Sequence, residues 1–180
     1  TTFAAFEPTL DYVAVKFPRW PFDKFVYAKK TLGTQMKATG EVMAIADNFE
    51  EALLKAVRGA EIKQSSLSLP GLAAKTDEEI RALLNDITDE RLFVIYEAIK
   101  RGISIDEIYQ ATKVDRWFLY GIKNIADNPS LSEPPSKFIY KMVDTCGGEF
   151  EAQTPYFYSV TSGTENEALP FIEKSKKQRV

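Results

Sequence analysis

Apolar residues alternate with polar or smaller ones near the start of the chain. Along residues 11–17, Val13, Val15 and Phe17 fall on one side, which predicts a half-buried strand. Proline has no N–H to give to a sheet ladder, so the following Pro-Arg-Trp-Pro at 18–21 is expected to form a loop or a sheet edge.

A second strand and a helix are predicted next. Residues 41–46 contain the run Val-Met-Ala-Ile, which is typical of a buried strand. Asn48 is suited to cap a helix, and Glu51 lies three residues later, where it would close a capping box. Apolar residues then recur at helical spacing until Gly59, where the helix is expected to end.

The middle of the chain changes to a purely helical pattern. Residues 61–75 are rich in serine and read as a polar connector, and residues 76–127 follow helical spacing. Three helices joined by short turns are expected to bury their apolar stripes only against each other. The expected start and stop signals are capping boxes at Thr76/Glu79 and Ser104/Glu107, starts at Asp89 and Asp115, and a left-handed stop at Gly102.

The last third combines loops with two apolar segments. Residues 128–136 are rich in proline and serine and predict a loop. Residues 140–146 and the aromatic cluster 156–158 are too apolar for a free linker, so they are expected to pack back along the body of the protein. The basic run 174–179 indicates a solvated linker. Both ends are interpreted as cuts inside a longer chain.

Composition narrows the possible functions. The chain has 180 residues, 44% of them hydrophobic, and a formal net charge of −3. This charge gives no long-range attraction to nucleic acid or to anionic lipid. No apolar stretch is long enough to span a bilayer, and no signal-peptide pattern begins the chain. A single cysteine favours a reducing, cytoplasmic location.

Groups that commonly carry catalysis are scarce. The sequence has no histidine, the commonest general base and metal ligand, and neither of the common glycine-rich phosphate loops. With no histidine to activate it, Cys146 is interpreted as a buried structural residue rather than a reactive thiol. Tyr156 to Tyr158 lack interleaved basic residues, so packing is favoured over base stacking. A self-sufficient small enzyme, and a metal site, are therefore not predicted.

Two places stand out as candidate sites. Glu41 lies in an apolar strand, where an ionised carboxylate must find donors, unless it is solvated or paired at the strand's start. Arg19 and Lys37 either shape the same region or are ordinary surface or ion-pair residues. Arg116 and Trp117 either belong to an interface, where both residue types are enriched, or follow the Asp115 cap as a helix start with a core tryptophan.

A nucleic-acid-binding domain is the alternative function. The turn at 101–104 and its flanking helices resemble a helix-turn-helix. The helix after that turn begins with Asp106 and Glu107 and contains no cation. A recognition helix is expected to present lysine and arginine to the phosphates, so the charge argues against this alternative.

Four stretches in matching order resemble the large subunit of carbamoyl-phosphate synthetase. They are FEPTLDYV with KFPR, then QMKATGEVMAI, then DRWFL, and finally VDTC with EF and TPYFYS. The resemblance covers almost the whole chain, from the first of these stretches to the last. In the family, several more helical turns usually separate the counterparts of Phe118 and Tyr140, where this chain has only a loop rich in proline and serine.

This resemblance implies a fold that is mainly α with a small α/β N-terminal part. Residues 1–62 would be the end of the carboxyphosphate ATP-grasp domain, with its terminal strands and helix. Residues 63–75 would be a connector, 76–160 the helical oligomerisation domain with a return segment, and 161–180 a linker toward the second synthetase half.

The resemblance also implies a role. Such enzymes make carbamoyl phosphate, for pyrimidine and arginine biosynthesis, from bicarbonate, glutamine-derived ammonia and two ATP, using Mg or Mn and K. None of these would be bound by this segment, which alone is expected to be inactive. Glu41 would line the internal passage taken by carbamate. The implied partners are the rest of the large subunit, the glutamine-hydrolysing small subunit and further copies through the helical domain, with no nucleic acid and no membrane.

Overall fold

The computed structural model describes residues 10–22, 24–25, 27–132, 139–143 and 156–161. Its elements, in chain order, are β1 (Val13–Arg19), β2 (Gly40–Ala46), α1 (Phe49–Gly59), α2 (Pro70–Ala73), α3 (Asp77–Leu83), α4 (Arg91–Lys100), α5 (Ile105–Thr112), α6 (Arg116–Asp127), a 3-10 turn (Pro129–Ser132), β3 (Ile139–Met142) and β4 (Phe157–Val160). Mainly helical content with a small strand-bearing N-terminal part agrees with the predicted class.

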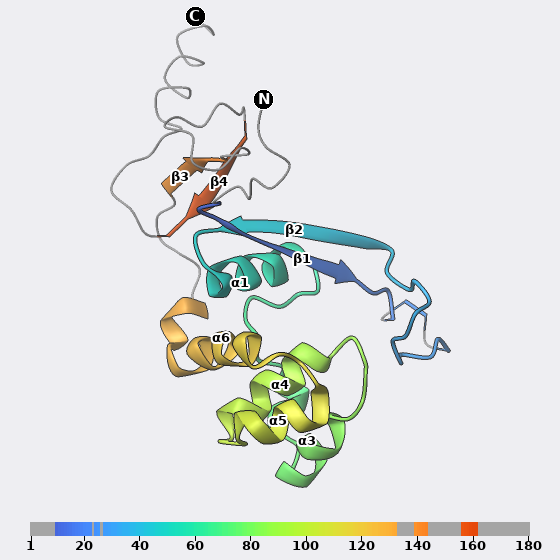
Figure 1. Ribbon diagram of the computed structural model, residues 1–180. Coiled ribbons are helices and arrows are strands. Elements are labelled where there is room, and N and C mark those ends of the chain that lie inside the picture. The colour runs from blue at the N-terminus through green and yellow to red at the C-terminus, as the bar shows by residue number, and fades with distance from the viewer. Residues whose placement is uncertain (1–9, 23, 26, 133–138, 144–155, 162–180) are drawn as a thin grey trace, which may run out of the picture.

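Strands β1 and β2 form an antiparallel ribbon that lies along α1 (Figure 1). Alternation places Phe17 and Ala44 on the buried face against the helix. The prediction of a fully buried second strand is wrong, because Met43 on the opposite face is 67% exposed. Of the two expectations for 18–21, a loop or a sheet edge, the edge holds at Pro18 and Arg19: both lie in β1, an edge strand of the two-stranded ribbon, with Pro18 opposite Glu41.

The connector is more ordered than its polar composition predicts. Leu67 is fully buried, and Leu72, in the short helix α2, is buried beside it in the same core. Pro70 opens α2, a position where its missing N–H is not needed. The connector therefore packs against the helices rather than spanning a gap between two separate parts.

Most of the predicted helix signals are confirmed. Thr76 and Glu79 form a full capping box at α3, and Asp115 caps α6 by accepting from the N–H of Trp117 at 2.8 Å. Gly102 has a φ of 79°, the left-handed stop expected after α4. The predicted boxes at Asn48 and Ser104 are formed on one side only: each accepts from the backbone N–H three residues later.

Two details of the helical part differ from expectation. Asp89 does not start α4, whose N-cap is Glu90, with no side-chain cap hydrogen bond. The loop predicted at 128–136 begins with a 3-10 turn, which follows directly on α6, whose end at Asp127 agrees with the predicted helical spacing.

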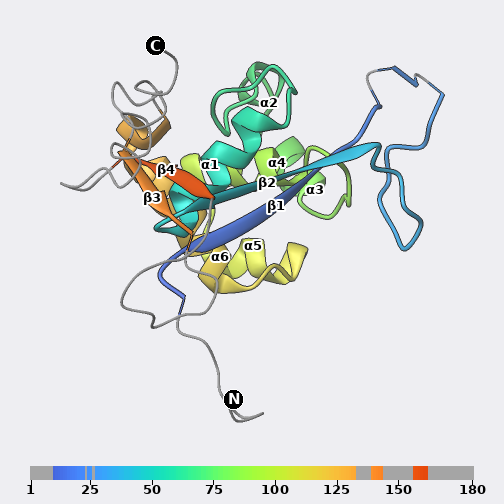
Figure 2. The ribbon, with the colours of Figure 1, turned by 90° about the horizontal axis from the view of Figure 1, so that it is seen from above.

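The two predicted parts share one hydrophobic core. Helix α6 packs on α1 as well as on α4 and α5, so the helical stripes are not buried only against each other. At this joint the Phe49 ring lies 5.2 Å from Trp117 and 5.6 Å from Phe118, measured between ring centroids. Figure 2 shows the β1–β2 ribbon running diagonally across the molecule, with α5 and α6 to one side of it.

The return segment packs back on the body, as predicted. Strands β3 and β4 form a second antiparallel pair beside the end of β2. Lys55 of α1 donates to the carbonyl oxygens of Ile45 and Ser159, at 2.9 and 3.2 Å, and so links the two sheets. Burial lowers the pKa of Lys55. Asp47 accepts from Lys141 and from the Tyr158 hydroxyl.

Several predictions fall outside the described residues. These are the buried role of Cys146, the basic run 174–179 and nearly all of the linker 161–180. Within the aromatic cluster, Tyr158 is buried, which agrees with packing, whereas Tyr156 is exposed.

We expect Gly121→Ala to loosen the joint between α1 and α6. A methyl group at this position would lie 2.5 Å from the Phe49 ring, and that ring is held by Trp117 and Phe118. Overpacking of this kind costs about 1–3 kcal/mol, against a gain of about 1 kcal/mol in helix propensity. A net loss of stability should appear in urea or thermal unfolding.

Gly71→Ala is the matched control. Its added methyl group would meet nothing within 4 Å, so stability should be unchanged or slightly higher. If Gly121→Ala were as stable as this control, the Phe49 contact would not constrain the joint.

Candidate functional site

The outer face of α6 is an exposed aromatic surface. The Leu119, Ile122 and Ile125 side chains turn inward and are buried. On the opposite side, Trp117 is 60% and Tyr120 is 57% exposed. Residues three apart are neighbours on a helix, so the two rings lie on one face. The interpretation of Trp117 as a core residue is therefore wrong.

Arg116 is anchored at the edge of this surface. Its guanidinium lies 3.8 Å from the centre of the Tyr109 ring of α5, and its Nη2 is 2.8 Å from the Asp106 carboxylate. The hydrogen bond to Asp106 raises the pKa of Arg116, so the group stays charged. Arginine held in this way can donate to a partner without losing much conformational freedom.

Tyr120 was missed in the sequence analysis. A signal was present, because it lies three residues after Trp117 in a helix with a predicted start. We define the α6 surface as Arg116, Trp117 and Tyr120, with Phe118 at its margin.

Glu41 lies on the exposed face of the β1–β2 ribbon. Its side chain is 58% exposed, and its Oε1 is 3.0 Å from the Lys16 Nζ of the neighbouring strand. Exposed Met43 follows on the same face. An exposed ion pair contributes about 0–1 kcal/mol, so Glu41 is not required to hold the ribbon together.

The remaining candidates, Arg19 and Lys37, lie near the same end of the ribbon as Glu41, with Arg19 opposite Gly40 in the ladder. Lys37 donates to the carbonyl oxygens of Lys29 and Thr31 and thus braces the loop between the strands. Arg19 lies at the end of β1, where its Nη1 donates to the Trp20 carbonyl oxygen at 3.1 Å.

The described ranges contain neither a metal-binding cluster nor a membrane-spanning helix. Within them, no group of three or more histidine, cysteine, aspartate or glutamate side chains is placed to hold a metal ion. No helix in this part of the chain has the length and apolar character needed to cross a bilayer. The helix-turn-helix alternative gains no support, since Asp106 and Glu107 open α5 and pair with Arg116 and Arg81.

Comparison with known proteins gives consistent matches. This chain matches a segment of the carbamoyl phosphate synthase large chain in each of three relatives. The arginine-specific large chain of Halalkalibacterium halodurans is 43% identical over 98% of this chain and 21% of the relative. That of Geobacillus stearothermophilus is 40% identical over 94% and 20%, and the large chain of Lachnoclostridium phytofermentans is 44% identical over 97% and 20%. The chain thus spans about a fifth of these relatives' length.

The relatives also contain residues that this chain lacks. The alignment with the Halalkalibacterium halodurans protein extends over 222 residues, whereas this chain has only 180. Such a difference is expected between Phe118 and Tyr140, where the family usually has several more helical turns.

The family comparison agrees with the relatives. Residues 41–136 match the family described as the oligomerisation domain of the carbamoyl-phosphate synthetase large chain. This match includes β2 from Glu41 onward, the six helices α1 to α6 and the α6 surface. The chain belongs to the carbamoyl-phosphate synthetase large-chain family and contains its oligomerisation domain.

Proposed function

We propose that this chain is the central structural segment of a carbamoyl-phosphate synthetase large subunit, where it links the two ATP-using halves and supports assembly of whole enzymes. The observation that carries the proposal is the exposed aromatic α6 surface within a domain matched to an oligomerisation family. Large exposed aromatic side chains are typical anchors of protein interfaces. The names of two relatives contain the word arginine-specific, which supports a role of the parent enzyme in arginine biosynthesis.

The parent enzyme would make carbamoyl phosphate from bicarbonate, ammonia and ATP, together with a glutamine-hydrolysing small subunit. This segment contributes organisation rather than chemistry. The ATP- and metal-binding residues of the parent belong to other segments, so the 180-residue chain by itself is expected to form no carbamoyl phosphate.

Glu41 supplies the second part of the proposal. Its carboxylate faces away from the core of this chain, so it is available to line a passage formed with the rest of the large subunit. A fixed carboxylate there would shape the electrostatic environment through which carbamate passes.

The first test concerns assembly. We expect sedimentation velocity of the purified chain to show dimers or larger species that increase with concentration. Trp117→Ala combined with Tyr120→Ala should weaken this association at least about tenfold, because it removes the two exposed anchors. Tyr27→Ala is the matched control, since Tyr27 is also an exposed aromatic residue but lies in the loop between β1 and β2.

Two results would contradict this assignment. Association that is equally strong in the double variant would place the contact elsewhere on the chain. A monomer at every concentration would leave the segment as a connector only. Thermal unfolding of each variant checks that the fold is intact.

The second test concerns Glu41. In the complete large subunit, Glu41→Ala should uncouple the two ATP-using steps, so that more bicarbonate-dependent ATP hydrolysis accompanies each carbamoyl phosphate formed. The fold should be retained, because substitutions of exposed residues usually change stability by less than about 0.5 kcal/mol.

Lys16→Ala separates the two roles of Glu41. It breaks the same ion pair but keeps the carboxylate, so coupling should stay normal. Unchanged coupling in Glu41→Ala would refute the passage role while leaving the assembly role untouched.

A further inference from the structure

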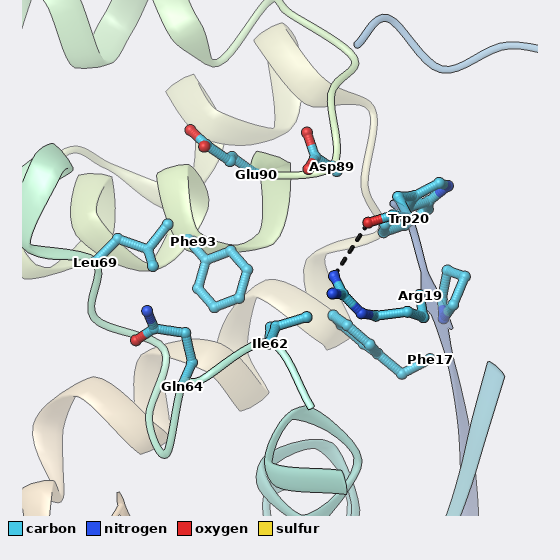
Figure 3. Close-up of a pocket in the computed structure, with 10 residues that line it drawn as sticks. Phe17, Arg19, Trp20, Ile62, Gln64, Leu69, Asp89, Glu90 and Phe93 are labelled. Carbon is cyan, nitrogen blue, oxygen red and sulfur yellow. Dashed lines mark hydrogen bonds between the residues drawn. The ribbon is translucent and has the colours of Figure 1, made fainter. Parts of the chain in front are cut away.

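A pocket of about 160 Å³ lies where the end of β1, the connector and the start of α4 meet (Figure 3). Phe17, Leu69 and Phe93 are among its apolar walls, and Arg19, Gln64 and Asp89 supply polar groups. It is formed by segments far apart in the sequence, and neither the α6 surface nor Glu41 belongs to it.

Asp89 is the unusual member of this pocket. Its Oδ1 atom is buried and has no hydrogen-bond partner among the residues that the structure describes. It does not serve as the cap of α4, because Glu90 occupies that position. A buried carboxylate oxygen without a donor is costly, so this atom favours a ligand that brings an N–H group.

The remaining walls restrict the ligand further. The rings of Phe17 and Phe93 offer flat apolar contact, and the Gln64 amide offers an additional acceptor oxygen. Asp89 and Glu90 together outweigh the single positive charge of Arg19, so the wall is net negative. Drug-sized ligands occupy pockets of about 300–1,000 Å³, so this pocket suits a smaller molecule.

We propose that this pocket binds an amidinium or guanidinium group carried on a small, flat, apolar body, with Asp89 as its counter-ion. Such groups are planar, present several N–H donors in a fixed fork and are more weakly hydrated than ammonium. They therefore lose less on entering a pocket with aromatic walls. The group can come from a free small molecule or from an arginine side chain elsewhere in the parent subunit. The proposal is independent of the assembly and passage roles.

The test uses three probes of nearly equal size. Benzamidine, benzamide and benzoate are titrated into the isotope-labelled chain and followed by NMR, with the shifts mapped to the pocket. Benzamidine should bind at least about tenfold more tightly than neutral benzamide, since hydrogen bonds to charged groups are the stronger ones. Benzoate should bind most weakly. This comparison uses the unmodified chain, so it does not depend on any variant folding.

Asp89→Asn is the decisive variant. It keeps the shape of the side chain and should reduce benzamidine affinity about tenfold or more while leaving the melting temperature unchanged or higher, because the buried Oδ1 atom has no hydrogen bond to lose. Glu90→Gln, in the exposed part of the wall, is the control and should change affinity much less.

Three results would overturn the proposal. They are no benzamidine binding up to about 10 mM, benzoate binding as tightly as benzamidine, and full benzamidine affinity in Asp89→Asn. Repeating the titration on the complete large subunit identifies the source of the group. Binding there indicates a free ligand, and binding only to the 180-residue chain indicates an arginine side chain of the parent.

Discussion

The arrangement of the helices depends on one set of hydrogen bonds, which the guanidinium of Arg101 donates. It lies at the C-terminal end of α4 and donates to the carbonyl oxygens of Leu72, Ala73 and Lys75, and to the carboxylates of Asp77 and Glu97, at 2.7–3.2 Å. Among these acceptors, the Leu72 carbonyl oxygen also accepts from the Lys75 N–H at 3.1 Å, and the Glu97 side chain is buried. The hydrogen bonds to Glu97 and Asp77 raise the pKa of Arg101, so its charge persists and compensates both carboxylates. One side chain therefore fixes the connector, the start of α3 and the end of α4 relative to each other.

This constraint explains why the boundary between the two predicted parts is a change of composition and not a change of packing. The connector is held by Arg101 on one side and by the burial of Leu67 and Leu72 on the other. The contact of Phe49 with α6 closes the same core from the opposite direction. As a result, the α6 surface and the exposed face of the β1–β2 ribbon belong to one packed unit. A partner bound at α6 would be placed at a defined position relative to Glu41.

What the sequence could predict was decided by local chemistry. Thr76 with Glu79, Asp115 and Gly102 each act within three residues of their own position, so pattern alone identifies them. The predicted helix start at Asp89 is wrong, because the neighbouring acidic residue, Glu90, takes the cap position. The exposure of Met43 and Trp117 depends on which other elements cover their faces, and periodicity gives a face but not its neighbour. Of the five acceptors of Arg101, Glu97 lies four residues away on the same helix, but the other four lie 24 to 29 residues away, beyond the range of any local pattern.

The free energies involved distinguish the assembly role of the α6 surface from the passage role of Glu41. Fully burying an aromatic side chain removes about 150–250 Å² from water, at about 25 cal/mol per Å². With 60% of Trp117 and 57% of Tyr120 still exposed, each ring could contribute about 3 kcal/mol to an interface. A symmetric pair of copies buries four such rings, which is comparable to the association cost of about 4–15 kcal/mol. The balance favours a contact that forms and dissociates with concentration rather than a permanent dimer. The exposed pair of Glu41 and Lys16 is worth about 0–1 kcal/mol. A substitution on the α6 surface should therefore change the strength of self-association. A substitution of Glu41 should leave the structure almost unchanged and alter the activity of the parent enzyme.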